Sequence, residues 1–374
     1  MATITLPGLI DPHVHLRDLG QDEKEDFYTG TAAALAGGFT TVLDMPNNPE
    51  PITTIERLVK KKQIAKEKIV CDVGFYFGTQ GNNFEEFEKL SSPNILRANE
   101  ESREANNDQF STSSNNNVYG LKVYMNHTTG NFLFDKSLLT KLFGSWTHAA
   151  GPILFHAEGE SIGQVLQVVK KHPKPVHICH ISTREELQFV LDAKQLGMPI
   201  TCGVTPHHLF LTESDAIKLG PFGMMKPPLT TKEDQEFLWK NLHNIDVIES
   251  DHAPHSKEEK QNQPVPFGVP GLETTLPLLL TAVNGNRLTI DDIIRLCHTN
   301  PARIFHVPVD KTTTVEVDMD SEYEIKNENL LTKSKWSPFD GWKVKGKVRA
   351  VTLRGLGVFD DGEIIAKPGC STLL

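Results

Sequence analysis

Eight short apolar segments alternate with helical patterns along the first four-fifths of this chain. They read LIDPHVHL, FTTVLDMP, IVCDVGFYF, YGLKVYM, PILFHAE, VHICHIS, PITCGVTPH and DVIESDHAP. Strand followed by helix, repeated eight times, predicts a parallel sheet that closes into an α/β fold of the (β/α)₈ TIM barrel type. A doubly wound open sheet is the alternative for such a pattern. In a barrel, side chains at the carboxyl ends of the strands share one mouth, where such enzymes place their active sites.

Two regions depart from this pattern. Residues 89–118 are polar and rich in Asn and Ser, so we expect a partly disordered insertion on the barrel surface. Residues 309–374 alternate polar and apolar side chains, which predicts a small β-rich C-terminal extension packed on a barrel of residues 1–308. The chain opens almost directly at LPGLIDPHVH, so no strand is expected ahead of it.

Composition narrows the function classes. The net charge of −10 argues against a nucleic-acid or anionic-membrane partner. No apolar stretch approaches the roughly 20 residues that span a bilayer, and the first residues lack the features of a signal peptide. The 5 cysteines are an odd number and lie far apart, which favours a reducing, cytoplasmic location.

Side chains that bind metals stand at the ends of several predicted strands. His13 and His15 are two residues apart, so an extended backbone turns both imidazoles to one side. His156, His180 and Asp251 end three further strands. Imidazole and carboxylate in this ratio suit Zn²⁺ or a similar first-row metal. Together they exceed the needs of one tetrahedral ion, so the pattern favours two ions.

Lys122 ends a strand between these positions, and its role is open from the residues alone. It is either the partner of a carboxylate elsewhere or a member of the metal group. Cys179, beside His180, is read as a core residue, with a ligand role as the alternative. His207, His208 and His252 are expected to orient loops or to point away from the metals.

The motifs GLIDPHVHLRD, MPN, GLKVYM, HAE, HICHIS, PHHL, SDHAPH, GLETTLP and NPARIF resemble those of the dihydroorotases, in the amidohydrolase superfamily. The resemblance covers nearly the whole chain apart from residues 89–118, and it extends to the dihydroorotase domain of the multifunctional eukaryotic pyrimidine-synthesis polypeptide. It implies reversible cyclisation of N-carbamoyl-L-aspartate to L-dihydroorotate plus water. It also implies fusion to or assembly with carbamoyl-phosphate synthetase and aspartate transcarbamoylase domains. A homodimer is expected separately, because the exposed helices of such barrels commonly form dimers.

The resemblance assigns roles residue by residue. One Zn²⁺ would be held by His13, His15 and Asp251, and a second by His156 and His180, with an N6-carboxylated Lys122 bridging the two. Asp251 would also be the general acid/base, exchanging a proton with a hydroxide shared by the metals. The substrate contacts that it implies are Arg17, Asn47 and His255 for the carboxylate, Lys226, and the backbone of Pro270 and Gly271. Thr128 would belong to a mobile flap over the substrate.

Alternatives stay open at this stage. Arg17 also fits a surface pair with Asp18 or Asp11, Asn47 a turn cap, and His255 an exposed loop. Gly203 stands where relatives often have an acidic residue, so a contact made there would be missing. Thr129 stands where an aromatic flap residue is frequent, which would alter turnover. The alternative functions are a weak or inactive dihydroorotase-like scaffold and another cyclic amidohydrolase, a dihydropyrimidinase or allantoinase.

Overall fold

All eight predicted strands are present in the computed structural model, which describes residues 3–90, 118–147 and 151–374. The third predicted strand is divided in two at Tyr76, whose hydroxyl donates a hydrogen bond to the carbonyl of Pro12 at 2.8 Å. The barrel strands are β2 (Leu9–Val14), β3 (Phe39–Asp44), β4 (Asp72–Phe75), β5 (Phe77–Gly78), β6 (Leu121–Tyr124), β7 (Ile153–His156), β8 (Val176–Ile178), β9 (Ile200–Val204) and β10 (Val247–Ile248).

Parallel pairing carries these strands around a closed barrel. One sheet has the order β2-β3-β4 and the other β5-β6-β7-β8-β9-β10, and neighbouring strands are parallel in both. Tyr119 N–H, just ahead of β6, donates to the carbonyl of Phe75 at the end of β4 at 2.9 Å, linking the two sheets. Val14 pairs in parallel with His252, just after β10, and this bridge closes the ring. The closed barrel confirms the predicted fold class and rules out an open doubly wound sheet.

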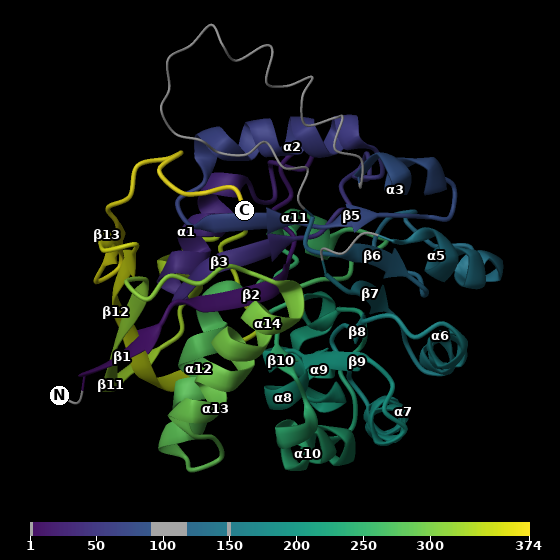
Figure 1. Ribbon diagram of the computed structural model, residues 1–374. Helices are drawn as coiled ribbons and strands as arrows, with labels where there is room; N and C mark the ends of the chain where they lie inside the picture. Colours follow the sequence, from purple (N-terminus) through teal and green to yellow (C-terminus); the bar gives the residue numbers. More distant parts are fainter. Residues whose placement is uncertain (1–2, 91–117, 148–150) are drawn as a thin grey trace, which may run out of the picture.

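Helices follow the strands and cover the barrel (Figure 1). The predicted capping box at Thr183 is confirmed: the Thr183 hydroxyl accepts from the backbone of Glu186, whose carboxylate accepts from Thr183 N–H. The helices are α1 (Phe27–Ala36), α2 (Ile55–Lys68), α3 (Phe84–Leu90), α5 (Leu139–Ser145), α6 (Glu160–Lys171), α7 (Arg184–Gln195), α8 (Pro206–Phe210), α9 (Glu213–Leu219), α10 (Lys232–Lys240), α11 (Lys257–Gln261), α12 (Leu272–Asn284), α13 (Ile290–Ile294) and α14 (Asn300–Phe305).

The interior of the barrel is filled by apolar side chains from its strands. Ile10, Leu43, Leu154 and Val247 form one buried cluster with Phe305 of α14. Filling the interior leaves the polar strand ends as the place where a ligand can enter.

A five-stranded antiparallel sheet packs beside the barrel, and the N-terminal segment belongs to it. Its order is β1-β11-β12-β13-β14, and β1 pairs with β11 so that Ile4 lies opposite Val317. The expectation of no strand ahead of LPGLIDPHVH is therefore wrong, because a five-residue strand needs only a partner edge and β11 provides it. The strands are β1 (Thr3–Pro7), β11 (Thr314–Glu324), β12 (Lys343–Leu353), β13 (Leu356–Asp360) and β14 (Glu363–Ile364).

The division of the chain at residues 308 and 309 stays a prediction, as does the insertion at 89–118, of which residues 91–117 lie outside the described part. In the part that is described, no helix combines the length and apolarity needed to cross a bilayer.

Candidate metal centre and substrate pocket

A pocket opens at the carboxyl ends of the barrel strands and gathers most of the predicted site residues. Its lining includes His13 and His15 at the end of β2, His156 at the end of β7, His180 after β8 and Asp251 after β10. Further predicted residues in the lining are Arg17, Asn47, Thr128 and Lys226.

Three ligand atoms from His13, His15 and Asp251 converge. Asp251 Oδ1 lies 3.3 Å from His13 Nε2 and 3.2 Å from His15 Nε2. His15 Nδ1 lies 2.7 Å from Asn47 Oδ1, and His13 Nδ1 lies 3.3 Å from Glu249 Oε2. Because both Nδ1 atoms face oxygen acceptors, their protons belong there, which leaves two Nε2 lone pairs directed at a carboxylate oxygen. A cation among these three atoms removes the repulsion, so this donor set fits a metal ion.

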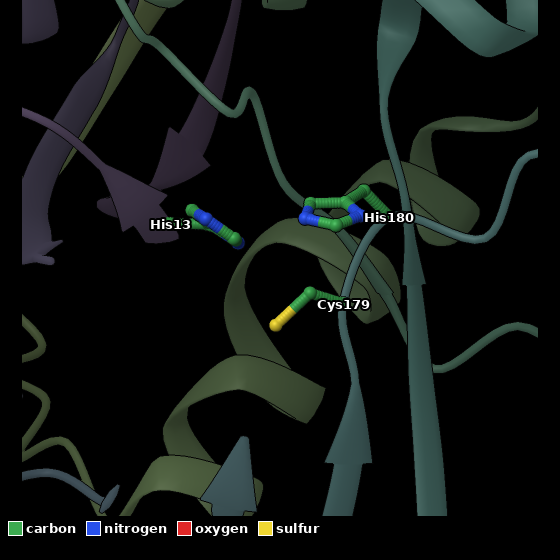
Figure 2. A group of neighbouring side chains, drawn as sticks. All are labelled: His13, Cys179 and His180. Atoms are coloured by element: carbon green, nitrogen blue, oxygen red, sulfur yellow. The ribbon is translucent and has the colours of Figure 1, made fainter. Parts of the chain in front are cut away.

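A second group adjoins the first. His156 Nδ1 lies 3.0 Å from His180 Nε2, and the buried His180 Nδ1 has no hydrogen-bond partner among the described residues. Lys122, on β6, is fully buried with its Nζ 3.1 Å from Cys179 Sγ. Ligand atoms of His13, Cys179 and His180 all lie within 4.8 Å of one another (Figure 2). Cys179 thus borders the metal group, although alternation along the strand places it with the core.

Burial keeps the imidazoles in the form that metals bind. It lowers the pKa of His13 to about 4, with the Lys122 charge acting in the same direction. It also lowers the pKa values of His15, His156 and His180 below the ordinary value. All four rings are therefore neutral at pH 7, as ligation requires. Burial raises the pKa of Asp251, against the opposing effect of His13 and Lys122.

Three of the predicted site residues have strained backbones. The φ angles of Arg17, His180 and Asp251 are 62°, 38° and 45°. A left-handed conformation in a residue with a side chain costs on the order of 1–3 kcal/mol, and it persists where the surroundings fix it, often at functional sites. The prediction that Arg17 shares the strand face of His15 is wrong, because β2 ends at Val14 and the chain then turns.

The turn directs Arg17 toward His255, as expected of a carboxylate pocket. Arg17 Nη2 lies 3.4 Å from His255 Nε2, and its Nε donates to the carbonyl of Pro254 at 3.2 Å. Both side chains are buried, so Arg17 forms no surface pair and His255 is no exposed loop residue. Asn47 uses its oxygen on His15, which leaves its amide N–H groups for a ligand. Lys226 also lines the pocket, with its Nζ 3.7 Å from Glu158 Oε2.

Pro270 and Gly271 are not brought into this pocket. They border a separate small cavity with His252 and Leu272, and Gly271 N–H donates to His252 Nδ1 at 3.2 Å. Their contact with a substrate ring stays a prediction.

The loop after β6 is hydrogen-bonded to the segment between α11 and α12 that carries Phe267. The Thr129 hydroxyl accepts from Phe267 N–H at 2.7 Å and donates to its carbonyl at 3.1 Å. Phe267 and Thr128 both line the pocket. An aromatic ring is therefore present at the mouth, supplied by Phe267 rather than by residue 129.

Sequence reasoning missed Glu249, which lies at the centre of this polar cluster. Its carboxylate is fully buried, accepts from His180 N–H and lies 3.6 Å from His177 Nε2 in addition to its contact with His13. Burial by itself would raise the pKa of Glu249, yet His13 and His177 bring it below the ordinary value. The signal was available, because Glu249 is two residues before Asp251 at the end of the same apolar run.

Glu249 lies beside Gly203, where a contact is expected to be missing. A Cβ atom at Gly203 would lie 2.4 Å from Glu249 Oε1. The carboxylate thus occupies the space that a side chain at 203 would fill, and β10 supplies what β9 lacks. His208 supports a neighbouring loop, as expected, with Nε2 3.2 Å from the carbonyl of Pro227.

The family model "Amidohydrolase family" matches residues 4–311. The multifunctional protein CAD of Squalus acanthias is 44% identical over 368 residues, which cover 98% of this chain but only 15% of that protein. The dihydroorotase of Pyrococcus furiosus is 39% identical over 383 residues and is covered to 84%, against 98% of this chain.

Solved structures agree in fold. The dihydropyrimidinase of Brevibacillus agri superposes with a TM-score of 0.87 at 21% identity, over 100% of this chain and 88% of that one. The inactive dihydroorotase-like domain of a CAD-like multifunctional protein from Chaetomium thermophilum gives 0.78 at 26% identity, with both chains fully covered. The barrel, its convergent histidines and these matches define one class: the chain belongs to the amidohydrolase family. Within that family it groups with the dihydroorotases.

Proposed function

We propose that this chain is a dihydroorotase that interconverts N-carbamoyl-L-aspartate and L-dihydroorotate with release or uptake of water. The observation that carries the proposal is the buried pair of Arg17 and His255 beside the convergent group of His13, His15 and Asp251. A cation fixed next to a hydrolytic centre suits a cyclic amide that carries a carboxylate. Arg17 would hold that carboxylate through its N–H groups, and Asn47 would add its amide.

Two Zn²⁺ ions are the proposed cofactor, held by His13, His15 and Asp251 on one side and by His156 and His180 on the other. When bound, they would polarise the ring carbonyl and lower the pKa of water to near 7. Lys122 is buried with its Nζ 3.1 Å from Cys179 Sγ, and a carboxyl group on Nζ would supply the anion proposed to link the two cations. The identity and number of the ions are part of the proposal.

Asp251 is the proposed proton carrier. In the hydrolytic direction, water oxygen bonds to the ring amide carbon, the carbon–nitrogen bond breaks, and the departing nitrogen needs a proton. Asp251 takes one from the attacking water and gives one to nitrogen; the cyclisation reverses these steps. Its burial and its raised pKa suit a group that must both accept and release a proton.

A catalytically inactive scaffold is the second candidate. It is favoured by the likeness to a solved domain that its own title calls inactive. Against it stands the convergence of three lone pairs on one point in this chain, since a decayed site has no need to keep them. A dihydropyrimidinase or allantoinase is less favoured, because an uncharged ring offers Arg17 no carboxylate to bind.

Turnover of dihydroorotate, dihydrouracil and allantoin by the zinc-loaded chain separates these candidates. We expect hydrolysis of dihydroorotate at least about 100-fold faster than that of the two uncharged rings, because a site built for a charged group strongly rejects substrates that lack it. Hydrolysis of dihydrouracil alone would move the chain to the dihydropyrimidinases, and hydrolysis of none would favour the scaffold.

The proposal extends to assembly. Two multifunctional relatives, of Squalus acanthias and Dictyostelium discoideum, are 15% and 16% covered by this chain. We infer that the natural context includes carbamoyl-phosphate synthetase and aspartate transcarbamoylase domains, that the barrel forms a homodimer, and that the protein is cytoplasmic.

A further inference from the structure

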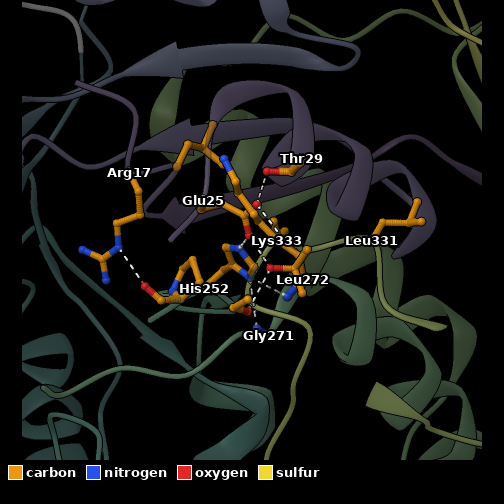
Figure 3. A network of polar contacts seen from close by, with 12 residues as sticks. Arg17, Glu25, Thr29, His252, Gly271, Leu272, Leu331 and Lys333 are labelled. Carbon is orange, nitrogen blue, oxygen red and sulfur yellow. Dashed lines mark hydrogen bonds and ion pairs between the residues drawn. The ribbon is translucent and has the colours of Figure 1, made fainter. Parts of the chain in front are cut away.

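His252 follows Asp251 and points away from the metal group, into a buried polar network (Figure 3). Its Nδ1 lies 3.2 Å from Gly271 N–H and 3.4 Å from Leu272 N–H. Two backbone donors at one nitrogen require a lone pair there, so the ring proton sits on Nε2. Nε2 in turn lies 3.3 Å from Glu25 Oε2 and donates to it. The tautomer of His252 is thus fixed by its surroundings.

Glu25 connects this histidine to the C-terminal extension. Its carboxylate is fully buried just before α1. It accepts from the Thr332 hydroxyl, from Lys333 N–H at 3.0 Å and from the Thr29 hydroxyl of α1, in addition to His252. A few residues further on, Trp336 Nε1 donates to the carbonyl of His255, the partner of Arg17, at 2.7 Å.

The backbone of His252 is held as firmly as its ring. His252 accepts at its carbonyl from His15 N–H at 2.8 Å and forms β-bridges with Val14 and Val269. Immediately before it stands Asp251, with its positive φ of 45°. A residue in this conformation stays there only while its neighbours hold it, and His252 is the neighbour anchored at both ring nitrogens.

We propose that Glu25 and His252 are a positioning pair for Asp251. Through this pair, residues 332–333 of the C-terminal extension hold the Asp251 carboxylate at the metal group. Neither side chain touches the reacting atoms; both act by fixing the backbone from which Asp251 projects. The inference rests on the proposed function for its activity measurement, but not for its metal measurement.

The chain offers a matched control in Glu273, on α12. Glu273 is another buried carboxylate, and it accepts from Leu331 N–H at 2.7 Å and Thr332 N–H at 2.9 Å. It therefore holds the same segment as Glu25. None of its hydrogen bonds among the described residues is to His252. In Glu25→Gln, one carboxylate oxygen becomes an NH₂ group that faces donors. Glu273→Gln makes the same chemical change at a carboxylate that contacts residues 331–332 but not His252.

The test compares these variants in the zinc-loaded protein. For Glu25→Gln we expect a kcat for dihydroorotate lowered tenfold or more with KM changed less than threefold, and a tenfold weaker zinc affinity by chelator competition, as for other changes behind metal ligands. For Glu273→Gln we expect kcat, KM and zinc affinity all to stay within threefold of the wild-type values. His252→Asn, which breaks the pair from its other end, should reproduce the Glu25→Gln losses, and the double variant should be no worse than either single.

Wild-type kcat and zinc affinity in a folded Glu25→Gln protein, or equal losses in Glu273→Gln, overturn the proposal. The proposal is also overturned if the losses of kcat and zinc affinity in the Glu25→Gln/His252→Asn double variant equal the product of the losses in the two single variants. If Glu25→Gln does not fold, the comparison of His252→Asn with Glu273→Gln decides by the same criteria. If the wild type does not turn over dihydroorotate, the proposed function fails, while the zinc affinities still decide whether the pair positions Asp251.

Discussion

Asp251 combines three properties at one residue: a buried carboxylate, a positive φ and an oxygen within 3.3 Å of two imidazole nitrogens. Burial raises its pKa, which by itself favours the protonated acid. A cation bound among His13, His15 and Asp251 would favour the carboxylate instead. The same side chain can therefore serve as a metal ligand when it is a carboxylate and as a proton donor when it is protonated.

Asp251→Asn should separate these two roles. The amide oxygen still offers one lone pair to a metal, but it cannot take up and return a proton. We expect kcat for dihydroorotate to fall about 100-fold or more, with most of the bound zinc retained. Elemental analysis beside steady-state kinetics checks both, and unchanged turnover would end the assignment as general acid/base.

Arg17→Lys tests the carboxylate pocket. Lysine keeps the charge but loses the planar fork that a carboxylate meets in two parallel hydrogen bonds. We expect KM for dihydroorotate to rise about tenfold, which corresponds to roughly 1.4 kcal/mol, with kcat changed much less. A KM within twofold of wild type would show that the carboxylate binds elsewhere.

At the scale of strands and helices, the sequence was informative where apolar and polar residues follow a regular pattern along the chain. Apolar runs ending in polar residues located all eight barrel strands, and the end of each run located His13, His156 and His180. Local pattern failed where tertiary contacts decide. β1 exists because β11 offers it an edge, and Arg17 reaches the pocket through a turn rather than along β2. The position of Glu249, two residues before Asp251, was visible in the sequence, but its partners His13, His177 and His180 lie on or after other strands and only the fold shows them.

Gly203→Ala tests that space. A Cβ atom 2.4 Å from Glu249 Oε1 must displace the carboxylate. We expect a loss of about 1–3 kcal/mol in the free energy of unfolding, as for overpacking of a dense core. Gly163→Ala is the control, since a Cβ there meets no atom within 4 Å and α6 gains helix propensity. Equal stability of the two variants in urea would show that Glu249 does not need this glycine.

At the scale of the whole molecule, the mouth of the barrel removes many titratable groups from water. The metal-site histidines are joined by His208 and His255, whose pKa values burial lowers to about 4. These neutral rings help a cofactor to bind but leave the apoprotein sensitive to acid. This sensitivity to acid arises from the burial of several histidines together and not from any single metal ligand.

Acidification should therefore destabilise the metal-free protein. Below a pH of about 6.5 the unfolded chain binds protons at its histidines, whereas folded His208 and His255 stay neutral until pH approaches 4. Stability present above pH 6.5 is lost as pH falls, by up to about 1.4 kcal/mol per unit for each such residue. Urea unfolding of EDTA-treated protein at pH 7.5 and 5.5 measures this, and equal free energies at the two values would contradict it.

The most direct test of a two-metal dihydroorotase is to count metal and turnover in the same sample. Purified protein is assayed for dihydroorotate hydrolysis and for bound zinc as isolated, after removal of metal with EDTA, and after zinc is returned. We predict about two zinc ions per chain, loss of hydrolysis on chelation, and recovery that follows zinc uptake. Full turnover by metal-free protein, or a fully loaded protein with no turnover, would contradict the account.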